Sequence, residues 1–409
     1  MKKLILVLVV VLVLFGAYMS WNQIHSVPAG SDAPAASDVS AVGGADAPDS
    51  VTVSQPAAPA EIRTMDFDAL RELYPADTAA ITVAGESLNW GVYRDWLRME
   101  GLQIEAYFRQ MAAYYGMAAD WEGSVGDGSG MTYAQYLQHE TNESLSSFLA
   151  IRAFAKENGV ELDEEQRASL EPEAMAADIV GEGATVEQLA EKLESESHMT
   201  VDAFRYYSES VMLYRNCHDA LYGEGGEKID AADVVKYLED EGYLSAGHIL
   251  FMTIDPNTGD KLDAETVAAK KQQAETIVAE LRAIEDHEER VKRFLEHKEQ
   301  FCEDGGKVTY PDGYTFTPGT MVAEFESAVR ALEDYGVSDP VESTYGYHVI
   351  LRLPLDADSL LFSAQGTPST ARSQMAQQEL SEKLDAFYTA NPPAYADGLE
   401  ALDLTQYLR

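Results

Sequence analysis

The chain has 409 residues and a formal net charge of −41 at pH 7, with 70 acidic against 29 basic side chains. This length is enough for two or three domains with a sizeable core. The acidic balance argues against nucleic acid and anionic membrane surfaces as partners, because both reward Lys and Arg. The composition indicates a soluble, self-repelling surface, but it does not indicate a substrate.

The N-terminus carries the pattern of an exported protein. Two lysines precede an apolar run from Leu4 to Trp21. A secretory signal has an apolar stretch of about 7–15 residues and a spanning helix one of about 17–25, so this run lies at the boundary between them. We expect residues 1–21 to form a single-pass membrane anchor, with a cleaved signal segment as the alternative. Because no Lys or Arg follows until Arg63, the body of the protein should lie on the extracytoplasmic side, or be secreted if the segment is cleaved.

Residues 22–62 are rich in Ala, Pro, Ser, Asp and Gly and contain almost no large apolar side chain. Such a segment cannot bury enough surface to offset its ordering entropy. We expect a disordered linker that holds the folded body away from the membrane. From the coil relation, its average reach is on the order of 35 Å.

Residues 63–242 show mostly helical patterns. A strand-like piece at 80–88 precedes a helical pattern at 90–115 and, after a glycine-rich gap, a second one at 133–158. Later apolar-periodic runs begin at residues suited to capping a helix, namely Asp163, Thr185, Thr200 and Asp230. We interpret the apolar stripes of these helices as core, with an exposed cradle for other polypeptides as the alternative.

The pattern changes at residue 243. In chain order, the expected elements are a strand, three helices and a strand, at 247–253, 264–284, 291–299, 321–332 and 347–353. Two strands that enclose helices predict a small α+β domain with an antiparallel sheet, which we place at 243–355. Residues 356–409 contain a further helix at 372–388 with an apolar face, and we expect it to return to the helical lobe.

Common active-site motifs do not occur in this sequence. It contains no phosphate loop, Gly-x-Ser-x-Gly, His-Glu-x-x-His or paired Cys-x-x-Cys. Its two cysteines are Cys217 and Cys302. An exported protein could join them in a disulfide bond, but two cysteines do not make a disulfide framework. We favour the alternative, in which both thiols are unpaired.

Three short segments carry the functional signal. They read Ala-Gly-His-Ile-Leu-Phe at 246–251, Pro-Gly-Thr-Met-Val-Ala-Glu-Phe at 318–325 and Thr-Tyr-Gly-Tyr-His-Val-Ile at 344–350. Each resembles a landmark of the parvulin-type peptidyl-prolyl isomerases, and they follow that family's order. The whole layout resembles the extracytoplasmic foldases of the PrsA/SurA type. In those proteins a helical chaperone lobe, a parvulin domain and a returning C-terminal helix form one molecule.

The resemblance implies three catalytic residues. His248 and His348 stand at the family's two histidines, and Asp304 stands where the family places an acid or a thiol. Rotation about an X–Pro bond crosses a barrier of ~18–20 kcal/mol, and catalysis means favouring the twisted amide over both planar forms. The histidine pair with the nearby acid would set tautomers and polarity around the rotating carbonyl, without a metal or a cofactor. A metal site is the weaker alternative, because the histidines lack local ligand spacing.

The resemblance also implies a slot for the proline ring. Met321 and Phe325, four residues apart on one helical face, match the pair that grips this ring, and Tyr345 stands where Phe is usual. We expect Met321 and Phe325 to be partly accessible, because a slot must open to its ligand. The family's Gly-Gly-Asp-Leu-Gly loop would lie over Tyr310-Pro311-Asp312-Gly313-Tyr314, where only the Asp matches.

These implications give an expected function and one alternative. The first is a peptidyl-prolyl cis/trans isomerase and foldase that assists exported proteins, with unfolded or partly folded polypeptides containing X–Pro bonds as its partners. Because the departing loop would line the binding groove, the alternative is a non-catalytic or weakly catalytic binding chaperone of the same architecture.

Overall fold

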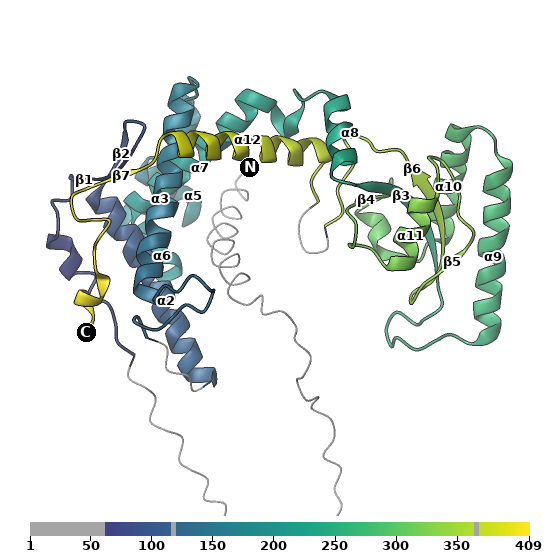
Figure 1. The fold of residues 1–409 in the computed structure, drawn as a ribbon, viewed down its shortest axis with the longest axis horizontal. Helices are drawn as coiled ribbons and strands as arrows, with labels where there is room; N and C mark the ends of the chain where they lie inside the picture. The colour runs from purple at the N-terminus through teal and green to yellow at the C-terminus, as the bar shows by residue number, and fades with distance from the viewer. Residues whose placement is uncertain (1–61, 116–119, 364–367) are drawn as a thin grey trace, which may run out of the picture. The chain divides into compact units, whose positions relative to one another are not determined.

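The structure is a computed structural model, and it describes residues 62–115, 120–363 and 368–409 (Figure 1). The expected anchor at 1–21 and all but the last residue of the expected linker lie outside the described residues. Within those residues, no helix combines the length and the apolar character needed to cross a membrane.

The chain divides into two compact units. One comprises the chain up to Asn216 together with Leu384–Arg409, and the other is Cys217–Lys383. The domain boundaries expected from the sequence fall at other positions and stay a prediction.

The first unit is mostly helical and carries a small sheet. In chain order its elements are η1 (Ala69–Glu72), β1 (Ala79–Val83), β2 (Glu86–Asn89), α2 (Trp90–Tyr115), α3 (Tyr133–Glu157), α4 (Glu164–Ser169), α5 (Pro172–Ile179), α6 (Val186–Ser197), most of α7 (Val201–Tyr222), the end of α12 (Ala371–Ala390), β7 (Ala394–Tyr395) and η4 (Leu404–Tyr407). The predicted caps Asp163 and Thr185 form capping boxes at the starts of α4 and α6.

The strand expected at 80–88 is a hairpin. Ala84 and Gly85 both adopt positive φ, at 48° and 84°, and this two-residue turn reverses the chain between β1 and β2. On its other side β1 pairs with β7, so the sheet order is β2-β1-β7. The C-terminal segment also enters the core of this unit, where Leu399 is fully buried.

The second unit contains an antiparallel sheet in the order β4-β3-β6-β5, which agrees with the predicted α+β class. Its elements are the end of α7, η2 (Glu224–Gly226), α8 (Ala231–Asp240), β3 (Leu244–Met252), α9 (Ala264–Ala283), α10 (His287–Phe301), η3 (Gly305–Val308), β4 (Tyr314–Phe316), α11 (Ala323–Ala331), β5 (Val341–Glu342), β6 (Gly346–Leu353) and the first part of α12. Strands β4 and β5 were not expected, because two or three residues are too few to show an alternating pattern.

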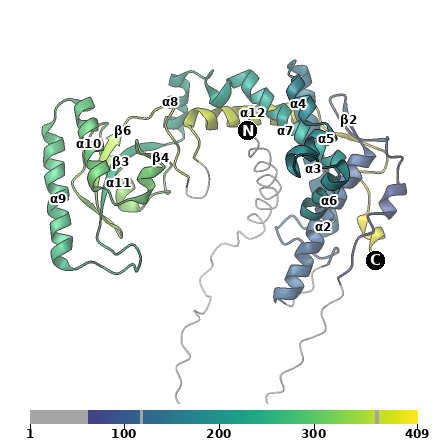
Figure 2. The same ribbon diagram turned by 180° about the vertical axis from the view of Figure 1, so that it is seen from behind.

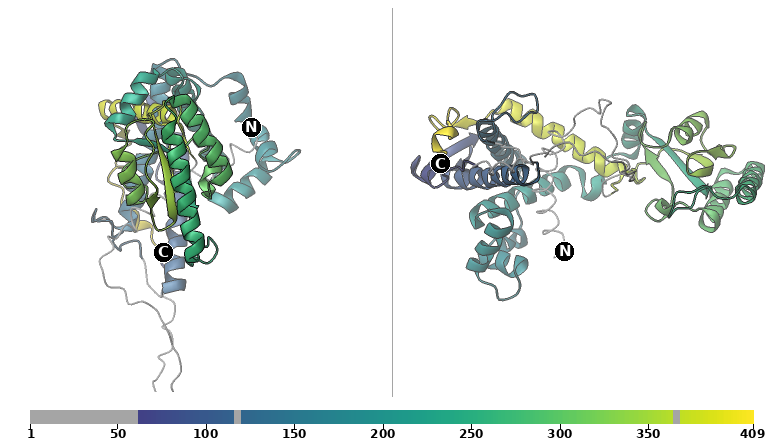
Figure 3. Two further views of the ribbon diagram at one scale, coloured as in Figure 1. Left: turned by 90° about the vertical axis from the view of Figure 1, so that its right-hand side faces the viewer. Right: turned by 90° about the horizontal axis from the view of Figure 1, so that it is seen from below.

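The two faces of this sheet are covered by different helices (Figures 1 and 2). Alternate residues of β3 and β6, among them Ile249 and Val349, pack against α9 and α10 on one face. On the opposite face Ala246 and Ile350 pack against Phe325 of α11. Figure 3 shows these layers from the side and from below. Because side chains alternate along a strand, His248 and His348 lie on the α11 face.

Candidate active site

The two central strands of the second unit bring His248 and His348 together. In the antiparallel pair of β3 and β6, Leu250 stands opposite His348 and Ile350 opposite His248, so the histidines are diagonal neighbours. Their Nδ1 atoms are 3.0 Å apart, and their rings stack with a centroid distance of 5.2 Å. Both side chains are buried.

Asp304, which is partly buried, completes a chain of hydrogen bonds that begins at the two buried histidines. It lies just after α10 and caps η3, where the Gly306 N–H donates to its Oδ1 at 3.0 Å. Its Oδ2 lies 2.8 Å from His248 Nε2 and accepts a second bond from the Tyr314 hydroxyl at 2.5 Å. Burial raises the pKa of Asp304, but the bonds from His248 and Tyr314 outweigh it and hold this pKa well below its usual range.

His348 ends the chain on the other side. Its Nε2 lies 2.7 Å from the Ser343 hydroxyl, in the loop between β5 and β6. Burial, followed by the proximity of His248, lowers the pKa of His348 to about 3, so this ring is neutral at physiological pH.

Only a few proton positions satisfy this chain. Because an ionised carboxylate only accepts, His248 Nε2 must donate to Asp304. If His248 is neutral, His348 Nδ1 donates to it and Ser343 donates to His348 Nε2. If His248 is charged, both of those bonds reverse. One proton on His248 therefore sets the direction of the bonds from Ser343 to His248.

The two residues of the apolar pair differ in accessibility, and Phe325 is the one that lies beside the histidines. The Phe325 ring meets His248 edge to face at 5.3 Å and His348 at 5.7 Å. Met321 is half-buried and packs against the cluster that contains Phe325. Phe325 is only 3% exposed, so the expected partial access is wrong for this residue. The reason is that α11 presses it onto β3, β6 and Phe316.

Tyr345 is the outermost of the expected site residues. Its side chain is 47% exposed, and its backbone N–H donates to the Ser343 hydroxyl at 3.2 Å. That hydroxyl is also the partner of His348. Tyr345 is therefore connected to the buried chain through its backbone, while its ring remains open to solvent.

Two members of the hydrogen-bonded chain, Tyr314 and Ser343, were not among the site residues expected from the sequence. Tyr314 lies in the loop where the chain departs from the family's pattern, so the departure itself was the available signal. Ser343 lies five residues before His348 with no distinguishing feature.

Both cysteines are free and buried. The Cys302 thiol lies 3.4 Å from the Leu250 N–H and 3.7 Å from the His248 carbonyl oxygen, so it joins the end of α10 to β3. Burial raises the pKa of this thiol. In the part of the chain that the structure describes, no group of three or more His, Cys, Asp or Glu side chains could hold a metal ion.

His297 of α10 is buried, although this helix is rich in charged side chains. Its Nε2 lies 3.2 Å from Glu280 of α9, and its ring stacks on Phe301. A charged composition therefore does not prevent α10 from packing against α9.

Comparison with known proteins identifies the segment that holds these residues. Residues 248–353 match the Rotamase family model, described as a PPIC-type PPIASE domain. The chain is 47% identical over 60 residues to foldase protein PrsA 1 of Bacillus cereus, which covers 14% of this chain and 21% of that protein. It is 33% identical over 110 residues to chaperone SurA of Burkholderia thailandensis, which covers 27% of this chain and 21% of that protein. The parvulin-type resemblance of this segment is thus confirmed.

The matching segments span about a fifth of the length of these two curated relatives. Among solved structures, peptidylprolyl isomerase PrsA of Bacillus cereus is 18% identical, covering 67% of this chain and 93% of that chain with a TM-score of 0.27. A likeness at this level carries no argument. Residues 248–353 and the site within them therefore carry the evidence for function.

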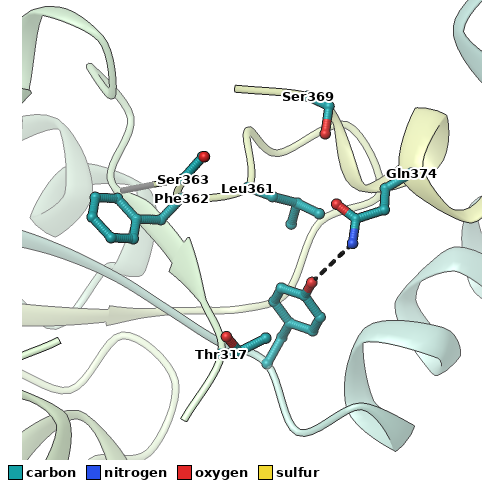
Figure 4. Close-up of a pocket in the computed structure, with 7 residues that line it drawn as sticks. Thr317, Leu361, Phe362, Ser363, Ser369 and Gln374 are labelled. Atoms are coloured by element: carbon teal, nitrogen blue, oxygen red, sulfur yellow. Dashed lines mark hydrogen bonds between the residues drawn. The ribbon is translucent and has the colours of Figure 1, made fainter. Parts of the chain in front are cut away.

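A separate cavity of about 290 Å³ lies elsewhere in the second unit (Figure 4). Its lining residues are Tyr243, Thr317, Leu361, Phe362, Ser363, Ser369 and Gln374. None of the six site residues expected from the sequence lines it, and we assign it no role in the isomerase site.

Proposed function

We propose that the protein is a peptidyl-prolyl cis/trans isomerase and foldase. The observation that carries this proposal is the hydrogen-bonded chain His348–His248–Asp304 next to Phe325, inside the segment matched by the family model. Met321 packs against the apolar cluster that contains Phe325. Buried polar groups joined in one satisfied network keep fixed orientations and act in a low local dielectric. Such a network can favour a particular charge distribution in a bound amide.

The proposed chemistry is a rotation without bond cleavage. In the twisted X–Pro amide the C–N resonance is lost, so the charges on its oxygen and nitrogen differ from those of the planar forms. Met321 and Phe325 would hold the apolar proline ring and exclude water, and the histidine chain would supply a fixed polarity near the carbonyl. None of these residues needs to accept or release a proton during the rotation.

The test is isomerisation of an Xaa-Pro peptide by the full chain, compared with the Asp304→Asn variant. We expect the wild type to accelerate the exchange, which takes tens to hundreds of seconds unaided. The variant should be slower while its thermal midpoint stays within a few degrees. An inactive wild type would overturn the proposal, and equal loss of folding and activity in the variant would mean that Asp304 is a structural residue.

Two observations favour a second function, a binding chaperone with a weak isomerase domain. Phe325 is buried, so the expected slot is not open in this structure. The loop at 310–314 also departs from the family's pattern. Suppression of client aggregation that persists unchanged in Asp304→Asn and His348→Gln, without measurable isomerisation by the wild type, would favour this function.

The proposal for the whole chain includes its location and its partners. The names of the relatives, a foldase and a chaperone, support unfolded or partly folded polypeptides as clients. Residues 63–242 with the C-terminal helix would form the chaperone lobe, and residues 243–355 the isomerase domain. The apolar run at 1–21 would place the body outside the cell membrane. Membrane fractionation with N-terminal sequencing tests the anchor against a cleaved signal.

A further inference from the structure

The loop at 310–314 differs from the family's pattern but is firmly held. The buried Lys298 of α10 donates through Nζ to the carbonyl oxygens of Tyr310 and Pro311, at 2.9 and 2.6 Å. The Tyr310 N–H donates to the Gly306 carbonyl at 2.9 Å. Because a buried ammonium group needs hydrogen-bond acceptors, these contacts hold the loop in one defined conformation.

This conformation directs the Tyr314 side chain into the site. Tyr314 begins β4 and pairs with Ala246 of β3. Its ring meets His248 edge to face at 5.5 Å, and its hydroxyl bonds to Asp304 Oδ2. The room for this hydroxyl depends on Gly306, because a Cβ at that position would collide with it. The glycine and the tyrosine are therefore complementary.

Other aromatic residues fix the ring of Tyr314. Tyr310 lies 4.8 Å from it and Phe362 lies 5.6 Å from it, measured between ring centroids. The backbone N–H of Phe362 donates to the Thr315 carbonyl at 2.7 Å, so the segment after β6 lies along the outer edge of β4. Figure 4 shows the Phe362 ring pointing away from Leu361 and from the centre of the cavity. The Phe362 ring thus packs on the two tyrosines, and the residue also contributes to the lining of the cavity.

We infer that Tyr314 is a positioning residue of the isomerase site, and that its hydroxyl fixes the Asp304 carboxylate that accepts from His248. This inference rests on the proposed function. The hydroxyl and His248 Nε2–H bond to the same oxygen, so together they determine where the carboxylate sits. A fixed acceptor on His248 Nε2 in turn holds the orientation of the ring that faces His348. The residue that departs from the family's pattern thus takes part in the network.

The experiment compares four variants of the full chain with the wild type, namely Tyr314→Phe, Asp304→Asn, their double variant and Tyr310→Phe. Tyr310→Phe is the matched control, because it also removes a tyrosine hydroxyl from this loop. The Tyr310 hydroxyl accepts from the Ser363 N–H and does not bond to Asp304. Two readouts are used. One is the kcat and KM of peptide isomerisation, and the other is the NMR resonance of the His248 Nε2 proton.

Tyr314→Phe should lower kcat about 10-fold, as expected for a hydrogen bond to a charged group, and leave KM within about twofold. The double variant should be no slower than Asp304→Asn, because Tyr314 acts through Asp304. Tyr314→Phe should also shift the His248 Nε2 proton resonance, since His248 no longer shares the carboxylate oxygen. Tyr310→Phe should change neither readout.

Three results would overturn the inference. Tyr314→Phe could behave as Tyr310→Phe does, it could raise KM with kcat unchanged as a groove residue would, or its effect could add in full to that of Asp304→Asn. If the wild type does not isomerise the peptide, the proposed function fails, and the resonance alone decides the role of Tyr314. An unshifted resonance then overturns the inference as well.

Discussion

The neutral, buried state of His348 predicts how the second unit responds to acid. In the unfolded chain this imidazole titrates near 6.5, whereas in the folded unit burial and then His248 lower its pKa to about 3. The folded state therefore excludes a proton that the unfolded chain binds. The stability that His348 contributes is fully present above pH 6.5 and is lost as the pH falls from 6.5 towards 3.

The size of this effect follows from the same two values. At pH 5 the unfolded ring is almost fully protonated and the folded ring is almost fully neutral. Proton linkage then lowers the free energy of unfolding by about 2 kcal/mol relative to pH 7. The result changes little if the folded value moves by one unit, because pH 5 stays above it.

Hydrogen exchange of the β3 and β6 amides in the full chain, at pH 5 and pH 7, measures the opening free energy of this unit after correction for the intrinsic exchange rates. The wild type should lose about 2 kcal/mol more than His348→Gln, which cannot titrate. His287→Gln is the matched control, because His287 is exposed in the same unit and stacks on Tyr335. An equal loss in wild type and His348→Gln would refute the reasoning.

Three substitutions separate the roles of the apolar residues. Met321→Ala should lower kcat/KM roughly 10- to 100-fold, equivalent to about 1.4–2.7 kcal/mol of transition-state stabilisation. The free energy of unfolding should change little, because Met321 is only half-buried. Unchanged kinetics would exclude Met321 from the slot. Phe325→Ala should lower the free energy of unfolding by about 3–5 kcal/mol, because Phe325 is buried, and an unchanged urea midpoint would contradict this. Tyr345→Ala should leave stability within about 0.5 kcal/mol and raise KM, because its ring is exposed; a rise in kcat/KM would argue against contact with the peptide.

Long periodic elements could be predicted from the sequence. The expected helix at 90–115 has the same bounds as α2, and the predicted capping residues at 163 and 185 do begin α4 and α6. The short elements could not. The turn at Ala84 and Gly85 lacks the usual Asn-Gly or Asp-Gly signal, so one strand was expected where a hairpin exists.

The candidate site also has a part that could be predicted from the sequence and a part that could not. His248, Asp304 and His348 span a hundred residues, and their convergence could be expected because a resemblance in sequence carries the geometry of the resembling fold with it. Burial could not be expected in the same way. Periodicity shows that Phe325 faces the sheet together with Met321, but how deeply each enters depends on what covers them, and Phe316 of the unexpected strand β4 is part of that cover.

Tyr314 shows why a departure from a pattern carries information of its own. Judged by resemblance alone, the loop at 310–314 has lost the family's motif, since four of its five positions do not match. In the structure the loop is anchored by Lys298, and the Tyr314 hydroxyl donates a second hydrogen bond to Asp304 Oδ2 while its ring packs against His248. A tyrosine that is buried next to a carboxylate needs a partner for its hydroxyl, and Asp304 is that partner. The loop at 310–314 and Asp304 therefore form one structural unit, and the activity of this site has to be measured with that loop in place.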